Sequence, residues 1–221
     1  MKRNLSAWLA GAAFSAAALT SANAADSSYR YTPPPVFTWA GVYVGANASM
    51  NIGQFSEGGA SYFGNAFGGL YGITAGYNYQ SGALVAGVEA DLDFGSVNGN
   101  AYPLGLVHSS GNITGDGSLR LRFGYAFNRA LLYITGGYTG ASMNGSLVDL
   151  GAPNIYASQS NYLNGFVVGG GMEYAVTNNL SLKAEYLFND YGSTPFFSGT
   201  RDSITSGVSF STIRAGVNYH F

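Results

Sequence analysis

The sequence contains no cysteine and very little charge. Without cysteine, a disulfide framework, a thiolate metal site and a cysteine nucleophile are all excluded. Only 9% of the 221 residues are charged, whereas a soluble domain carries roughly 25% Asp, Glu, Lys and Arg. Much of the folded surface is therefore expected to face something other than water. The net charge of -2 gives no basic footprint, so no nucleic-acid partner is expected.

Long hydrophobic runs are also missing. Beyond the N-terminus, Gly, Asn, Ser or a charged residue interrupts every apolar run, so none is long enough for a transmembrane helix. Any membrane crossing must use strands, whose backbone groups pair with one another. The chain is instead rich in Gly (33), Tyr (17) and Phe (14). Its 47% hydrophobic content disfavours Gly-rich disorder.

The N-terminus has the three parts of a secretory signal. Lys2 and Arg3 precede an apolar stretch at 7–19, and a small-residue site ends at Ala24. The apolar stretch is shorter than the ~20 residues that cross a bilayer, so cleavage after Ala24 is preferred to a membrane anchor. The domain division that follows is a signal peptide at 1–24, a proline-rich periplasmic leader at 25–38 and a barrel domain at 39–221.

Alternating hydrophobicity recurs eight times in the mature chain. Strands are predicted at 39–50, 69–80, 83–94, 118–127, 130–141, 163–176, 180–191 and 207–221. Three connections are tight, at 80–82, 128–129 and 177–179, and four are long, at 51–68, 95–117, 142–162 and 192–206. This alternation predicts an all-β fold, an eight-stranded antiparallel transmembrane β-barrel with short periplasmic turns and long extracellular loops.

The two faces of the predicted strands differ in polarity. In the last strand Ile213 and Val217 fall on one face and Arg214 on the other. A soluble lipocalin-like barrel would have an apolar inside and a wet outside, and the shortage of charge favours the opposite, lipid-facing arrangement. Several aromatic residues fall at the predicted periplasmic strand ends, as an interfacial girdle requires: Trp39, Tyr125, Phe127, Tyr174, Tyr219 and Phe221.

Nine charged residues are predicted to line the lumen: Glu89, Asp91, Asp93, Arg120, Arg122, Glu173, Lys183, Glu185 and Arg214. Ion pairs between neighbouring strands are expected, with the acidic residues at 89–93 beside Arg120 and Arg122. Glu173 is expected beside Lys183, and Glu185 beside Arg214. Because eight strands leave an interior just wide enough for side chains, a packed core is preferred, with a narrow diffusion channel as the alternative.

Catalysis, metal binding and cofactor binding are not expected. Of the two histidines, His108 falls in a predicted extracellular loop and His220 near the periplasmic end, so neither is expected beside a Ser and a carboxylate within the strands. His108 with Ser109 or Ser110 is the one catalytic candidate. Aromatic residues in the predicted loops offer surface binding as an alternative function: Tyr62, Phe63, Phe67, Tyr102, His108, Tyr156, Phe196 and Phe197.

Three stretches, at 37–45 (FTWAGVYVG), 132–137 (LYITGG) and 214–221 (RAGVNYHF), resemble the small outer-membrane β-barrels of alphaproteobacteria, the Omp25/Omp31-like porin family. The resemblance covers the mature chain. It implies a structural, porin-like protein of the cell outer membrane, in contact with lipid and lipopolysaccharide. Tyr219 and terminal Phe221 resemble the signal read by the barrel-assembly machinery. Some family members are associated with haem binding or host-cell contact, so loop-mediated binding is the alternative function, with no ligand implied.

Overall fold

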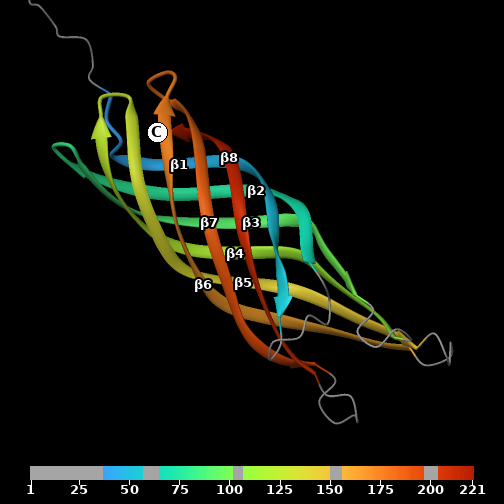
Figure 1. The fold of residues 1–221 in the computed structure, drawn as a ribbon. Helices are drawn as coiled ribbons and strands as arrows, with labels where there is room; N and C mark the ends of the chain where they lie inside the picture. The colour runs from blue at the N-terminus through green and yellow to red at the C-terminus, as the bar shows by residue number, and fades with distance from the viewer. Residues whose placement is uncertain (1–36, 57–64, 102–106, 150–155, 197–203) are drawn as a thin grey trace, which may run out of the picture. The chain divides into compact units, whose positions relative to one another are not determined.

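The computed structural model describes residues 37–56, 65–101, 107–149, 156–196 and 204–221. They form eight strands, namely β1 (Gly41–Ser56), β2 (Asn65–Ser81), β3 (Leu84–Ala101), β4 (Val107–Phe127), β5 (Ala130–Asp149), β6 (Tyr156–Ala175), β7 (Leu180–Phe196) and β8 (Ile204–His220). Consecutive strands pair antiparallel, and β1 also pairs with β8, so the sheet closes into a barrel (Figure 1). No helix suited to crossing a membrane occurs in these ranges.

The three short connections lie at the same end of the barrel as the C-terminus (Figure 1). Gly82 and Asn128 adopt positive φ angles of 60° and 54° in the first two turns. Glycine has no Cβ to clash in this left-handed region, and Asn enters it more readily than most residues. The predicted hairpins are therefore confirmed, although the first turn lies at 82–83 rather than at 80–82.

An exposed apolar band surrounds the barrel. On β3 its members run from Leu84 to Phe94, which matches the ~9–11 residues of a tilted transmembrane strand. Every strand contributes to the band, for example through Val44, Ile73, Leu92, Leu121, Ile134, Val168, Tyr186 and Ile213. The band has the apolar outer surface that a barrel in a lipid bilayer requires.

The aromatic girdle is present, with one correction. Tyr125, Phe127, Tyr174, Tyr219 and Phe221 are all exposed near the periplasmic end. Trp39 is not part of the girdle, because it is fully buried inside the barrel mouth. Its backbone nitrogen donates to Gln80 Oε1 at 2.7 Å, which turns the chain inward before β1 begins.

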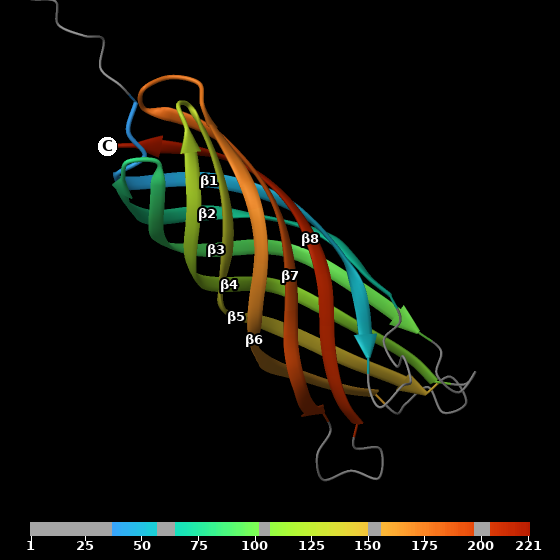
Figure 2. The same ribbon diagram turned by 60° about the vertical axis from the view of Figure 1, so that its left-hand side comes forward.

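The strands are longer than the sequence predicted. β4 begins at Val107 and β6 at Tyr156, so most of the predicted loops at 95–117 and 142–162 are paired strand. These segments are rich in Gly, Ser and Asn, which have low strand propensity, and here cross-strand pairing overrides that propensity. Beyond the apolar band, β3 to β6 continue together toward the end remote from the C-terminus (Figure 2).

We call this extension, residues 96–101, 107–117, 140–149 and 156–165, the outer stem. Its polarity is reversed relative to the band. Ile113 and Met143 are buried inside, whereas Asn98 and Asn144 are exposed outside. Register shifts between Phe94 and Val97 on β3 and between Ile113 and Gly115 on β4 mark the change. The stem therefore has the polarity of a water-soluble barrel. Because the apolar side chains change face at the register shifts, a single alternation pattern does not extend the predicted strands into the stem.

Candidate functional site in the barrel lumen

The structure places all nine predicted lumen residues inside the barrel. None of the nine is more than 5% exposed. They come from five strands, with β3 supplying the acidic residues at 89–93 and β4 supplying Arg120 and Arg122. We call these nine residues the ionic layer.

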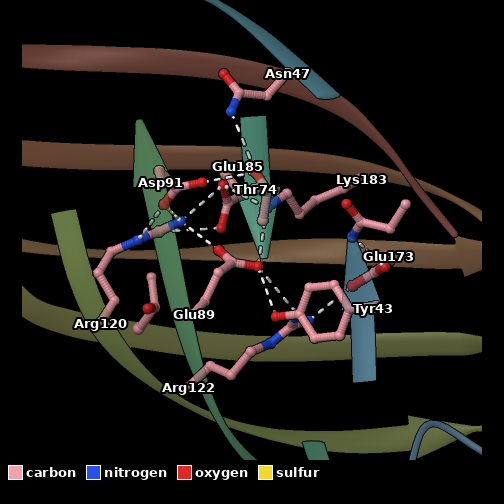
Figure 3. A network of polar contacts seen from close by, with 12 residues as sticks. Tyr43, Asn47, Thr74, Glu89, Asp91, Arg120, Arg122, Glu173, Lys183 and Glu185 are labelled. Atoms are coloured by element: carbon pink, nitrogen blue, oxygen red, sulfur yellow. Dashed lines mark hydrogen bonds and ion pairs between the residues drawn. The ribbon is translucent and has the colours of Figure 1, made fainter. Parts of the chain in front are cut away.

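Arg120 is the hub of the ionic layer (Figure 3). Its Nη2 contacts Glu89 Oε1 and lies 2.7 Å from Asp91 Oδ2. Its Nη1 lies 3.2 Å from Glu185 Oε1 on β7. One guanidinium group therefore links two acidic residues of the neighbouring strand β3 with one on a distant strand. Arginine suits this position because its planar fork presents five donors.

Arg122 and Tyr43 form a second junction (Figure 3). Arg122 donates to Tyr43 Oη at 2.9 Å and to Glu173 Oε2 at 2.8 Å. Tyr43 in turn donates to Glu89 Oε2 at 2.8 Å. The Arg122 guanidinium carbon also lies 4.0 Å from the centre of the Tyr133 ring, a cation–π geometry. Sequence reasoning missed both tyrosines, although each lies on the inward-facing period of its strand.

The expected pairing is partly wrong. Arg120 and Arg122 contact acidic residues on β3, as predicted. Glu173 and Lys183 are directly opposite in register, as are Glu185 and Arg214, yet their closest charge contacts lie elsewhere. These contacts are Lys183 with Glu89, Glu173 with Arg122, and Arg214 with Asp91 and Asp93. Long side chains in so narrow a barrel reach across the lumen instead of lying along the wall.

Inward-facing glycines provide the room for this crossing. A Cβ atom at Gly76 would lie 2.3 Å from Tyr43 Cζ, and one at Gly171 would lie 2.7 Å from Tyr133 Oη. Each glycine therefore accommodates an aromatic ring that folds over it. Glycine inside a strand thus marks the close approach of another side chain at these two positions.

His220 corrects a second expectation, because it does lie beside a serine and a carboxylate. Its Nε2 is 2.9 Å from Ser181 Oγ and 3.4 Å from Glu173 Oε1. In a catalytic triad the acid and the serine face different ring nitrogens, whereas here both face the same one. Ser181 is also fully buried, and its hydroxyl group donates a hydrogen bond to Glu173 Oε1 at 2.5 Å. The cluster therefore lacks the geometry of an activated nucleophile.

Aromatic rings close the lumen at its periplasmic end. Phe37 and Trp39 have ring centres 4.8 Å apart, and Trp39 and His220 have centres 5.6 Å apart. Phe37 itself comes from the segment predicted as leader. We call these three residues the periplasmic aromatic cluster.

A larger apolar cluster fills the other end of the lumen. Tyr191 and Phe210 stack with ring centres 5.4 Å apart. The whole group, which we call the outer apolar cluster, is Ala66, Leu70, Val97, Ile113, Ala141, Met143, Leu163, Tyr191, Val208 and Phe210. The ionic layer is therefore enclosed between two apolar seals.

The other predicted site residues have varied positions. His108 lies on β4 rather than in a loop, and Phe67 lies on β2, where it is exposed. Tyr156 is the first residue of β6, and Phe196 is the last residue of β7. Ala24, Tyr62, Phe63, Tyr102 and Phe197 lie outside the described residues. Among the described residues, no group of three or more His, Asp and Glu could hold a metal ion.

A closed antiparallel barrel with an apolar outer band and a polar, side-chain-filled interior defines a transmembrane β-barrel of the outer-membrane class. The profile of the family described as "Outer membrane protein beta-barrel domain" matches residues 9–221, and the chain belongs to this family. It is an outer-membrane protein of the Omp25/Omp31 kind, which confirms the resemblance in the sequence.

Two relatives illustrate this membership. The chain is 33% identical to the 31 kDa outer-membrane immunogenic protein of Brucella melitensis, over 91% of this chain and 94% of that protein. It is 31% identical to the 22 kDa outer membrane protein of Rhizobium leguminosarum, over 85% of this chain and 80% of that protein. Among solved structures, OprG from Pseudomonas aeruginosa matches with a TM-score of 0.49 and 13% identity, over 82% of this chain and 96% of that one.

Proposed function

We propose that this protein is a structural constituent of the outer membrane whose lumen does not conduct. The observation that carries the proposal is the Arg120 hub, which connects strands from different sides of the barrel through the centre of the lumen. A conducting path would have to pass through this hub and through both seals. Because the ionic contacts are mutual, no single side chain can swing aside without leaving a buried charge unpaired.

Sealing at three levels supports this choice over a narrow channel. Trp39 at one end and Phe210 at the other are at most 2% exposed. Between them the side chains of Arg120 and Arg122 are at most 1% exposed. An eight-stranded barrel filled in this way has no room for a continuous column of water.

We also propose that the protein has no enzymatic activity. The Ser181, His220 and Glu173 cluster is enclosed in the lumen, and its geometry provides no base aligned with a nucleophile. We further propose cleavage after Ala24 and insertion by the barrel-assembly machinery. The exposed aromatic side chains of Tyr219 and Phe221, with ring centres 5.2 Å apart at the end of β8, support the latter. Outer-membrane lipid and lipopolysaccharide would be its immediate surroundings.

Single-channel recording in planar bilayers tests the proposal. The mature protein should give no stepwise conductance, whereas a triple variant Trp39→Ala, Arg120→Ala, Phe210→Ala should, because it removes one filling side chain from each level. Leu121→Ala on the outer face is the matched control and should stay silent. Heat-shifted gel mobility verifies that each variant is folded. Regular ohmic steps from the unmodified protein would show that the barrel is a diffusion channel instead.

A further inference from the structure

The outer stem carries two regular rows of amide and hydroxyl side chains on its outward surface. The first row consists of four residues that lie directly opposite one another on successive strands: Asn98, Asn112, Asn144 and Ser160. The second row consists, in the same way, of Asn100, Ser110, Ser146 and Ser158. We call these eight residues the amide–hydroxyl face.

Side-chain hydrogen bonds hold the amide–hydroxyl face in a fixed arrangement. Asn112 donates to Asn98 Oδ1 at 2.6 Å, and Ser160 donates to Asn144 Oδ1 at 2.6 Å. Ser110 and Ser146 share a hydrogen bond of 2.6 Å in the second row. Asn112 uses both amide hydrogens within the protein, on Ser96 and Asn98, and its Oδ1 atom is buried. The exposed amides of Asn98 and Asn144 keep further donor and acceptor capacity, because Asn has two donors and an acceptor with two lone pairs.

The amide–hydroxyl face is uncharged. Every described Lys and Arg lies in the lumen except Arg129, which is in a periplasmic turn. Asp116 of the stem accepts a hydrogen bond from Tyr191 inside the barrel. The eight residues of the face thus offer no cation to a phosphate group and no anion to a basic partner. Its chemistry, Asn and Ser with nearby Tyr, is that of adaptable hydrogen-bonding surfaces.

The position of the face identifies its partner. It begins directly beyond the apolar band, so it stands at the height where the sugars of outer-leaflet glycolipids begin. Tyr162, opposite Ser142, is exposed between the band and the two rows, and Tyr138, opposite Phe166, is exposed at the adjoining edge of the band. Aromatic rings at such a boundary combine an apolar face with a polar hydroxyl group. A neutral saccharide chain matches both the uncharged rows and the two tyrosines.

We propose that the amide–hydroxyl face binds the uncharged saccharide chains of neighbouring lipopolysaccharide. The rows act as a hydrogen-bonding lattice, with Tyr138 and Tyr162 available to stack against a sugar ring. The proposal rests on the outer-membrane location of the barrel and is independent of whether the lumen conducts.

Titration calorimetry on the mature protein in phosphatidylcholine nanodiscs tests this proposal. The probe is neutral polysaccharide released from smooth lipopolysaccharide by mild acid. The variant Asn98→Ala, Asn144→Ala, Ser160→Ala should bind it about tenfold more weakly, since each lost hydrogen bond weakens binding modestly. Gln54→Ala, at an exposed polar position on β1 outside the face, is the matched control and should bind as the unmodified protein does. Ser158→Ala, Ser160→Ala is a milder variant should the triple variant fail the heat-shift test for folding.

A second arm separates sugar from phosphate. Phosphorylated core oligosaccharide from rough lipopolysaccharide should bind less well than the neutral polysaccharide. Added salt should leave the affinity for the neutral chain unchanged, because salt screens only charged contacts. Three results would each overturn the proposal: no binding of the neutral chain, preference for the phosphorylated core, or equal binding by the face variants and Gln54→Ala.

Discussion

The ammonium group of Lys183 lies 3.0 Å from Glu89 Oε2, although these residues are on β7 and β3, four strands apart in a barrel of eight. The contact crosses the lumen from one wall to the opposite wall. Glu89 also accepts from Tyr43 and contacts Arg120 and Arg122. The barrel is therefore braced internally, in addition to the hydrogen bonds between its strands.

Glu89→Gln should destabilise the barrel by about 3–5 kcal/mol, because it leaves buried cations without their shared carboxylate. Reversible urea unfolding in lipid vesicles measures this loss. The double variant Glu89→Gln, Lys183→Met should recover part of the stability, since one unpaired cation is removed with the acid. Asp190→Asn, on the same strand as Lys183 but outside the ionic layer, should change little. A loss for Glu89→Gln no larger than that of Asp190→Asn would contradict the bracing.

Gly76→Ala should cost about 1–3 kcal/mol, because the new methyl group would collide with the ring of Tyr43. Gly69→Ala on the same strand is the control, since its Cβ atom would approach nothing closer than 3.5 Å. The test compares the free energy of unfolding of Gly76→Ala with that of Gly69→Ala. Pairing Gly76→Ala with Tyr43→Leu should restore some of the loss, and equal effects at both glycines would rule out the close approach.

Leu121→Asp should lower the yield of folded protein in vesicles, because it puts a carboxylate on the lipid-facing side of β4, where charge is costly. Ser142→Asp also adds an outward carboxylate, but on the outer stem, and should fold normally. The readout is the fraction of protein that shows heat-shifted gel mobility after refolding. Failure of both variants would move the membrane boundary into the stem, and tolerance of both would refute the lipid-facing assignment.

Trp39→Ala should open the periplasmic end of the lumen. Because the chain has no native cysteine, a single Ser181→Cys reports on access to the lumen without background. Ser181 is fully buried, so this thiol should resist a charged methanethiosulfonate reagent in the intact barrel and react once Trp39 is truncated. A Ser142→Cys variant, exposed on the stem, should react in both cases. Rapid labelling at position 181 with Trp39 present would argue against the seal.

Much of the fold could be predicted from the sequence, because strand alternation and turn residues are local signals. The faces of β3, β4, β7 and β8 followed directly from their charged and apolar positions. The extent of the strands could not be obtained in this way, since the pattern reverses polarity between Leu119 and Ile113. Only pairing with neighbouring strands shows that both segments belong to one continuous β4.

The lumen was predicted in composition but not in connectivity. Register identifies which residues are opposite, such as Glu173 and Lys183, but not where a long side chain ends. The contact between Ser181 and His220 could not be predicted from charge pairing between strands, because Ser181 is uncharged. Trp39 was misplaced because it precedes β1, where no alternation assigns a face.

The register shift on β4 limits how such a chain can change in length. Thr114 is the extra residue there, between Ile113, which pairs with Met143, and Gly115, which pairs with Ser142. Deleting it would remove the bulge but keep Ile113 inward and opposite Met143, because the partners Ser142 and Met143 are consecutive residues on opposite faces of β5. A single deletion beyond Ile113 would instead turn the segment after it by one position, so that its outward and inward side chains exchange faces. Single-residue changes in the length of β4 should therefore accumulate at the bulge over evolutionary time, and elsewhere in the strand in pairs.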